Sequence, residues 1–301
     1  MEPVISTTEH QKILFDTVID EIVYALGAKK GGVIRNLIAP LLRNPASKLA
    51  TILADFYEGV INRSPSQGAI ETLPKFNIGV QRSGHPDMPM NGPHLLISNH
   101  PGGLDSVGIL SCIPRDDIKV LVSDVYLMRK LDYLNRHAIY VDFKTVGGMS
   151  ALRDAISHLN QGGVLLLFAR GEVEPDPACF SGAVESIEKW SPSLEIMLRK
   201  SPATSVQILS VSGAILPQFA FHPLTRLRRR PETRQKLAEF MQTITALYKP
   251  GKTKTILKIR FSEILRSESI PREAILLYII KMAQSEMKAH ISAIGERQAI
   301  D

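Results

Sequence analysis

Cysteine is scarce in this chain of 301 residues, with only Cys112 and Cys179 present. Two isolated cysteines supply neither a disulfide framework nor the spacing of a metal site, and they fit a reducing, cytoplasmic location best. No run of apolar residues approaches the ~18 that a membrane-spanning helix requires. The start of the chain, MEPVISTTEHQ, is acidic and polar, and it lacks the features of a signal peptide. Any contact with a membrane is therefore expected to be peripheral.

Aromatic residues are also scarce, at 6% of the chain, and they do not interleave with the basic residues as a nucleic-acid-binding surface requires. Lysine and arginine number 36 against 30 aspartates and glutamates, which gives a net charge of +6. This excess favours an acidic partner, such as a phosphate-bearing substrate, an anionic membrane surface or nucleic acid. Because the aromatic clusters are lacking, we expect no nucleic-acid partner.

Histidine is present but shows no spacing typical of a metal site. Four histidines are expected to be structural or exposed: His85, His94, His137 and His158. The sequence therefore predicts no bound metal and no cofactor.

The chain up to residue 70 predicts a helical subdomain. Apolar residues recur at helical spacing over 9–30 and again over 33–62. The second of these helices is expected to break at Pro40 and Pro45. The stretch SPSQG at 64–68 is typical of a linker.

From residue 71 to 301, strand and helix patterns alternate, which predicts an α/β domain with a mixed central sheet flanked by helices. The 44% hydrophobic content allows a sizeable core at this length. Strands are expected at 76–80, 94–98, 118–123, 138–143, 164–168, 206–216 and 253–265. Helices are expected from 107, over 150–160 and 226–248, and from Pro271 to about His290.

One short stretch, SNHPGGLDS at 98–106, combines a histidine and a carboxylate with a tight turn. Five helical steps of about 100° would leave His100 and Asp105 on different faces. Pro101-Gly102-Gly103 continues neither a strand nor a helix easily, so we expect a turn that folds Asp105 back onto His100. A carboxylate on one imidazole nitrogen fixes the tautomer and makes the other nitrogen more basic.

The nucleophile in such a site is expected to come from the substrate, because the chain has no G-x-S-x-G elbow. The second nitrogen of His100 can take a proton from a hydroxyl or from an amine. The structural alternative is that Asp105 caps the helix that follows and that His100 only ends the strand.

The stretch GPHLLISNHPGGLDSVGIL resembles the strand–turn–helix block of the glycerolipid acyltransferases, which carries their H-x4-D motif. This family includes glycerol-3-phosphate and lysophosphatidic acid acyltransferases. Three later stretches resemble further blocks of the family in the same order, over roughly 75–270: AIYVD, SALRDAISHLNQGGVLLLFARGE and ILP at 215–217.

The resemblance implies a transferase of lipid metabolism that serves phospholipid biosynthesis. It implies that His100 is the general base and Asp105 its orienting partner. An acyl group would pass from acyl-CoA or an acyl-carrier protein to the hydroxyl of glycerol-3-phosphate or a lysophospholipid. The residues that would then contact substrate are Asn99, Lys144, Arg170, Gly171 and Glu172.

The chain departs from the family in two blocks. Ala169-Arg170 stands where the third block usually has Pro-Glu, and Phe143, in place of a basic residue, follows Asp142. Arg170 can bind a phosphate or carboxylate, or it can pair with Glu172 or Glu174. The acceptor, the acyl-chain length and the choice of donor therefore stay open. The alternatives are acyl transfer to an amine, as in ornithine-lipid synthesis, hydrolysis of the thioester, and lipid or carrier binding without turnover.

A basic run lies near residue 230. It consists of Arg226, Arg228, Arg229 and Arg230. It fits anionic lipid head groups, the phosphates of the donor or an acidic carrier protein, although a solvated loop would also explain it. The preceding stretch, PQFAF at 217–221, is expected to dip into lipid, line an acyl channel or pack in the core.

Overall fold

The computed structural model describes residues 33–123, 134–141, 147–249 and 251–298, together with Phe15 and Ile19. The helix expected over 9–30 lies outside the described residues, apart from Phe15 and Ile19, which are helical. Phe143 and Lys144 also lie outside them.

A seven-stranded sheet forms the centre of the molecule, in the order β1-β7-β6-β2-β5-β3-β4. The strands are β1 Ile78–Gly84, β2 His94–Ser98, β3 Ile118–Ser123, β4 Ala138–Val141, β5 Val164–Phe168, β6 Ser205–Ser212 and β7 Thr255–Phe261. Strands β6, β2, β5, β3 and β4 run parallel, whereas β7 pairs antiparallel with β6 and parallel with β1. The expected mixed sheet flanked by helices is confirmed.

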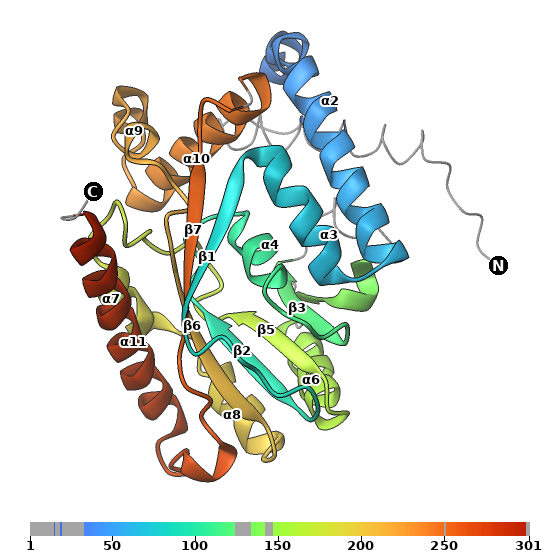
Figure 1. Ribbon diagram of the computed structural model, residues 1–301, viewed down its shortest axis with the longest axis vertical. Coiled ribbons are helices and arrows are strands. Elements are labelled where there is room, and N and C mark those ends of the chain that lie inside the picture. Colours follow the sequence, from blue (N-terminus) through green and yellow to red (C-terminus); the bar gives the residue numbers. More distant parts are fainter. Residues whose placement is uncertain are drawn as a thin grey trace.

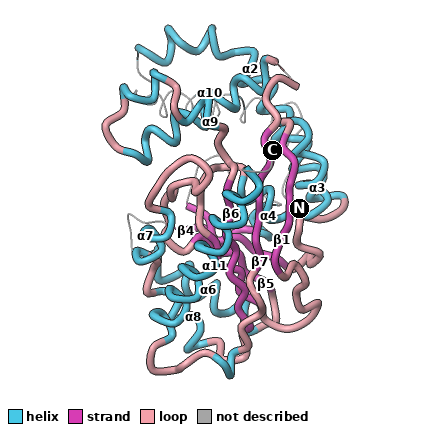
Figure 2. The backbone as a smooth tube through the Cα atoms, turned by 60° about the vertical axis from the view of Figure 1, so that its left-hand side comes forward, coloured by secondary structure: helices cyan, strands magenta, loops and turns pink. Residues whose placement is uncertain are grey.

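Helices cover both faces of this sheet (Figure 1). Their bounds are α2 Val33–Asn62, α3 Pro65–Thr72, α4 Asp105–Leu110, α6 Gly147–Asn160, α7 Ala183–Ser186, α8 Ser193–Lys200, α9 Pro217–Ala220, α10 Pro231–Tyr248 and α11 Ile275–Gln298. A short 3-10 helix, η4 Pro223–Leu227, precedes α10. Helices α2, α9 and α10 gather at one end of the molecule, and α6 and α8 lie toward the other (Figures 1 and 2).

The core consists of two hydrophobic clusters, one on each face of the sheet. Leu95 and Ile97 of β2 pack in the cluster with residues of α6, α8 and α11. Leu96, which lies between them, belongs to the cluster formed with α2, α3 and α4. Successive side chains of a strand point to opposite faces, so a strand buried on both faces is a continuous apolar run. For this reason HLLIS and VLLLF are the strands most easily recognised in the sequence.

The expected break in the second helix is wrong, because α2 runs without interruption from Val33 to Asn62 and contains Pro40 and Pro45. A proline inside a helix removes one backbone hydrogen bond and crowds the preceding turn. Packing offsets that loss here, because Pro45 and Ala46 are both buried.

The expected linker at 64–68 is also wrong, because these residues begin helix α3. The Ser64 side chain accepts a hydrogen bond from Gln67 N at 3.1 Å, and Pro65 occupies the first helical position. Serine is a strong N-cap, and proline is favoured directly after it. Ser-Pro therefore marks a helix start at this point.

The helices before residue 70 pack directly on the sheet. Ile52 of α2 and Ala69 of α3 share a cluster with Leu96, Leu166 and other sheet residues. The expected domain boundary falls inside α3.

Candidate active site

Three loops meet at one end of the sheet, at the carboxyl ends of the neighbouring parallel strands β2, β5 and β6. Ser98, the last residue of β2, is in register with Phe168 of β5 and with Leu209 of β6. In open α/β sheets, ligands bind outside the carboxyl ends of the parallel strands, where the connections diverge to either side. β2 is such a place, since its two neighbours both come later in the chain.

The turn after β2 brings Asp105 onto His100. The His100 Nδ1 and Asp105 Oδ2 atoms lie 2.8 Å apart, and Gly102 N donates to the same carboxylate oxygen at 3.2 Å. Asp105 is the first residue of α4 and is fully buried, whereas a quarter of the His100 side chain is exposed. With an ionised carboxylate at Nδ1, the proton stays on Nδ1 and Nε2 keeps its lone pair. Within the described part of the chain, no group hydrogen-bonds to Nε2.

Glu174 holds the backbone of His100 in place. His100 N donates to Glu174 Oε2 at 3.1 Å, and Glu174 N donates to His100 O at 2.8 Å. The other oxygen of this buried carboxylate accepts hydrogen bonds from Ser186 Oγ and Trp190 Nε1, at 2.8 and 3.2 Å. The sequence suggests Glu174 only as a partner for Arg170, and no local pattern marks its contact with His100, which spans 74 residues.

The imidazole ring is also packed from one side. The ring centroids of His100 and Phe168 lie 4.4 Å apart, with 33° between the ring planes. Phe168 is the last residue of β5, so the end of β5 packs against the histidine that follows β2. Together with Glu174 and Asp105, this contact restricts the rotation of the His100 side chain.

Three carboxylates set the charge state of His100. Burial of the imidazole lowers the pKa of His100, but the charge and hydrogen bond of Asp105, with further charges on Glu239 and Glu174, raise this pKa above its ordinary value. Burial also raises the pKa of Glu174. The histidine therefore binds a proton more tightly than a solvated imidazole does, as suits a base that must take one from a weak acid.

Asn99 joins β2 to β6. Its Nδ2 donates to Val211 O at 2.9 Å, its Oδ1 accepts from Val211 N at 2.8 Å, and the residue is buried. The amide continues the pairing of these two strands and fixes the residue before His100. These two hydrogen bonds direct the Asn99 amide toward β6.

Arg170, Gly171 and Glu172 lie on the loop after β5. Gly171 N donates to Phe168 O at 3.0 Å and closes a turn in which Gly171 has φ +74°, a conformation that favours glycine. The side chain of Arg170 is only 12% exposed, and its Nη2 lies 3.7 Å from Glu172 and 3.9 Å from Glu232. These ion pairs are long, so the guanidinium keeps donors for an anionic group.

The basic run begins on η4 with Arg226 and continues through the residues that join η4 to α10, and apolar side chains are exposed beside it. Arg226, Arg229 and Arg230 are exposed. The exposed fractions of Phe221, directly after α9, and of Leu224 and Leu227 on η4 are 63%, 50% and 76%. Of the expected stretch PQFAF, Ala220 is buried in a small cluster. Phe219 packs against the same cluster, whereas Pro217, Gln218 and Phe221 are exposed.

An apolar cavity of about 230 Å³ opens beside the turn. Its walls come from Gly103, Leu104 and Val107 around the start of α4, from α2 and α3, and from Val120 and Val122 of β3. The cavity lies on the face of the sheet covered by α2 and α3, and neither His100 nor Asp105 is among its lining residues.

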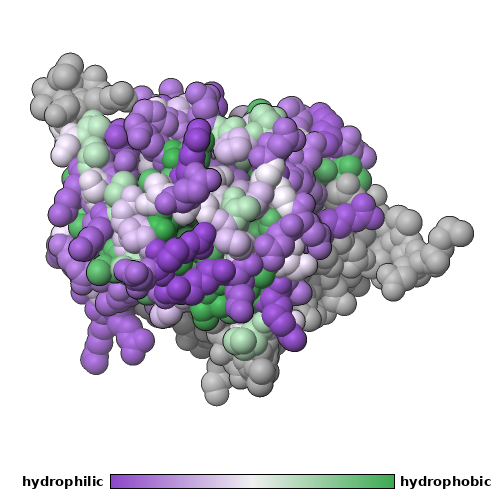
Figure 3. Space-filling view, turned by 90° about the horizontal axis from the view of Figure 1, so that it is seen from below, coloured by the Kyte–Doolittle hydropathy of each residue, from purple (hydrophilic) through white to green (hydrophobic). Residues whose placement is uncertain are grey.

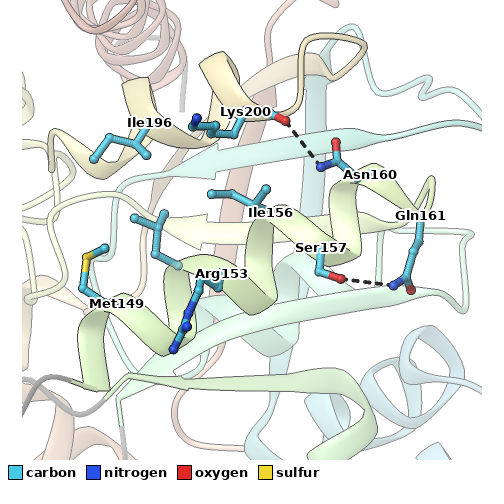
Figure 4. Close-up of a pocket in the computed structure, with 9 residues that line it drawn as sticks. Met149, Arg153, Ile156, Ser157, Asn160, Gln161, Ile196 and Lys200 are labelled. Carbon is cyan, nitrogen blue, oxygen red and sulfur yellow. Dashed lines mark hydrogen bonds between the residues drawn. The ribbon is translucent and has the colours of Figure 1, made fainter.

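A larger groove of about 720 Å³ lies elsewhere, between α6 and α8 (Figure 4). Met149, Ile156 and Ile196 supply apolar side chains, with Arg153 and Lys200 as its cations. None of its lining residues is a carboxylate, a histidine or a cysteine. The groove therefore offers no acid–base pair, and we do not assign the chemistry to it.

Neither cysteine is poised to act as a nucleophile. Both cysteines are free thiols, and burial raises the pKa of Cys112 and raises that of Cys179 to about 12, so neither is a ready thiolate. Among the described residues, no three His, Cys, Asp or Glu side chains form a metal cluster. Nor does any helix in the described part have the length and hydrophobicity to cross a membrane.

The chain was compared with known proteins. No family model and no curated protein matches it. Among solved structures, it is similar to the crystal structure of the 1-acyl-sn-glycerophosphate (LPA) acyltransferase PlsC from Thermotoga maritima, with a TM-score of 0.45 and 13% identity over 93% of this chain and 97% of that one.

Proposed function

We propose that this protein is an acyltransferase that moves a fatty acyl group from a thioester donor to the hydroxyl of a glycerolipid precursor. The observation that carries the proposal is the contact of 2.8 Å between His100 Nδ1 and the fully buried Asp105. A base oriented in this way, with no described residue bonded to its second nitrogen, suits the activation of a hydroxyl supplied by the substrate.

The reaction follows from that geometry. His100 Nε2 takes the proton of the acceptor hydroxyl as its oxygen attacks the thioester carbonyl carbon. The carbonyl oxygen gains the negative charge of the tetrahedral intermediate. As that charge returns to the carbonyl, the carbon–sulfur bond breaks, and the departing thiolate takes the proton from Nε2. Asp105 stabilises the imidazolium between these two transfers, and such base catalysis contributes about 10²–10⁴-fold.

The surroundings of the pair fit a lipid substrate. The apolar cavity beside Gly103 and Leu104 is suited to an acyl chain, because its lining is almost wholly hydrophobic. Arg170 is suited to a phosphate or carboxylate on the acceptor. Lys144 is proposed as a second cation for that group.

The protein is further proposed to work on the surface of an anionic membrane. The segment 221–230, here called the apolar–basic segment, exposes Phe221, Leu224 and Leu227 among its arginines. Apolar insertion combined with cationic attraction is the pattern of a peripheral contact. The face seen in Figure 3, at the end where α6 and α8 lie, is mostly hydrophilic with scattered apolar areas. The apolar–basic segment lies with α9 and α10 toward the other end (Figure 1).

A thiol-release assay tests the catalytic assignment. Acyl-CoA is incubated with the protein and with glycerol-3-phosphate, a lysophospholipid, an amino-acid amine or no acceptor. We expect release that depends on a hydroxyl acceptor and that falls at least ~100-fold in His100→Ala. His85→Ala is the matched control, since His85 is an exposed imidazole on the loop after edge strand β1.

Each other result has a defined meaning. Release that requires the amine assigns an N-acyltransferase, and release without any acceptor assigns a thioester hydrolase. Equal release by wild type and His100→Ala removes the catalytic role of His100. Binding of acyl-CoA without release in any arm leaves a lipid-binding protein.

A further inference from the structure

One face of α10 ties together the loops that form the candidate site. Gln235, Glu239 and Gln242 follow the i, i+4, i+7 spacing that places side chains on the same helix face. Gln235 Nε2 donates to Pro101 O and Glu174 O, each at 2.7 Å. Gln242 Oε1 accepts from Leu216 N at 2.8 Å, on the loop after β6.

Glu239, in the middle of this face, contacts the turn itself. Its Oε1 accepts the backbone N–H of Gly103 at 2.5 Å. A Cβ atom at Gly102 would lie 3.0 Å from the same oxygen, so the carboxylate and the turn are in close contact. Gly102 N, one residue earlier, donates to Asp105. Two successive N–H groups of the turn are thus held by two different carboxylates.

We propose that Glu239 is a positioning residue, which holds the Pro101–Gly103 turn and thereby keeps Asp105 on His100. The proposal rests on the proposed function insofar as the His100–Asp105 pair is the base. Glu239 acts through the turn and needs no contact with substrate.

The charges around Glu239 give this role a measurable signature. Burial raises the pKa of Glu239 to about 7, helped by the charge of Asp105 and opposed by the Gly103 hydrogen bond and by the charges of His100 and Lys236. In turn, Asp105, Glu239 and Glu174 raise the pKa of His100. Removing the charge of Glu239 should therefore lower the pKa of His100, and loosening the turn should lower it further by weakening the contact with Asp105.

Two variants separate these effects. Glu239→Gln loses the charge but keeps an oxygen that accepts from Gly103 N, whereas Glu239→Ala loses both. The pKa of His100 is measured by NMR titration of the ring-labelled full chain without substrate, and its signals are identified with His100→Ala. We expect a fall of about half a pKa unit or more in Glu239→Gln and a larger fall in Glu239→Ala. We also expect kcat/KM in the thiol-release assay to be at least ~10-fold lower in Glu239→Ala than in the wild type. Above pH 8, kcat/KM of Glu239→Gln should return in large part to the wild-type value.

Glu263→Gln is the control, because the Glu263 side chain is 80% exposed and pairs with His85 instead. Equal shifts of the His100 pKa in the two variants, or an unchanged His100 pKa in Glu239→Ala, would overturn the proposal. If Glu239→Ala does not fold, Glu239→Asp, which keeps the charge but shortens the side chain that reaches Gly103 N, decides through the same titration. If the wild type transfers no acyl group, the proposed function fails while the titration still tests Glu239.

Discussion

At the scale of single residues, the candidate site depends on where one carboxylate is placed. Asp105 is fully buried and lies at the start of a helix, so its charge is stabilised by Gly102 N and by His100 and is little screened by water. Its Oδ1 atom has no hydrogen-bond partner among the described residues. A carboxylate placed in this way makes His100 a stronger base than its partial burial would allow.

Replacing Asp105 with Asn tests this placement. His100 acts as a base only when neutral, so the rate should rise with pH through the pKa of His100. Asp105→Asn removes the charge that raises this pKa, so the rising limb of the kcat/KM profile should move to lower pH. The plateau should fall at least ~100-fold, because the imidazolium loses its stabilising partner. If the rising limb of Asp105→Asn lay at the same pH as that of the wild type, Asp105 would not set the basicity of His100.

The sequence allows only part of this site to be predicted. His100 and Asp105 are five residues apart, so the turn chemistry of Pro-Gly-Gly predicts that they meet. Glu174 and Glu239 lie 74 and 136 residues from the groups they hold. No local pattern marks such partners, because their positions depend on how the strands and α10 pack.

At the scale of helices and strands, burial explains why some elements are correctly predicted from the sequence and others are not. Strands β2 and β5 are recognisable because both of their faces are buried, and β7 because its side chains alternate between buried and more accessible. The break that local propensity predicts at the prolines of α2 is wrong because propensity takes no account of packing. The short helix α8 was not expected at all, although Leu194, Met197 and Leu198 bury one side of it.

The cap of α3 gives a stability prediction at this scale. Ser64→Ala removes the side-chain acceptor for Gln67 N and should lower the free energy of unfolding by about 1 kcal/mol. Ser47→Ala is the control, because Ser47 is exposed inside α2, where alanine is the better helix former. Urea titrations of both variants measure the effect. Equal stability of Ser64→Ala and wild type would mean that the cap contributes nothing to the fold.

At the scale of the whole molecule, the candidate site lies between the sheet and α10, and the apolar–basic segment leads into the same helix. A surface that holds the protein on lipid would thus lie close in the chain to the residues that organise the site. Access to a membrane-borne acceptor would then need no spanning segment.

Vesicle binding tests the apolar–basic segment. Replacing both Arg229 and Arg230 with Gln should weaken binding to vesicles of phosphatidylglycerol and phosphatidylcholine roughly 30-fold, at about 1 kcal/mol for each arginine. Leu227→Ser should weaken binding to neutral vesicles too, since the exposed leucine is expected to insert. Arg153→Gln, an exposed arginine on α6, should bind as the wild type does. Loss of binding in Arg153→Gln as great as in the double variant would contradict a localised docking surface.

The mass of the acceptor after the reaction shows whether His100 is the base for acyl transfer to an acceptor hydroxyl. Acyl-CoA and the hydroxyl acceptor are incubated with wild type or with His100→Ala, and the products are analysed by mass spectrometry. We expect an acceptor heavier by one acyl group with the wild type and ~100-fold less of it with the variant. Equal amounts of acylated acceptor from both proteins, or free fatty acid as the sole product, would contradict it.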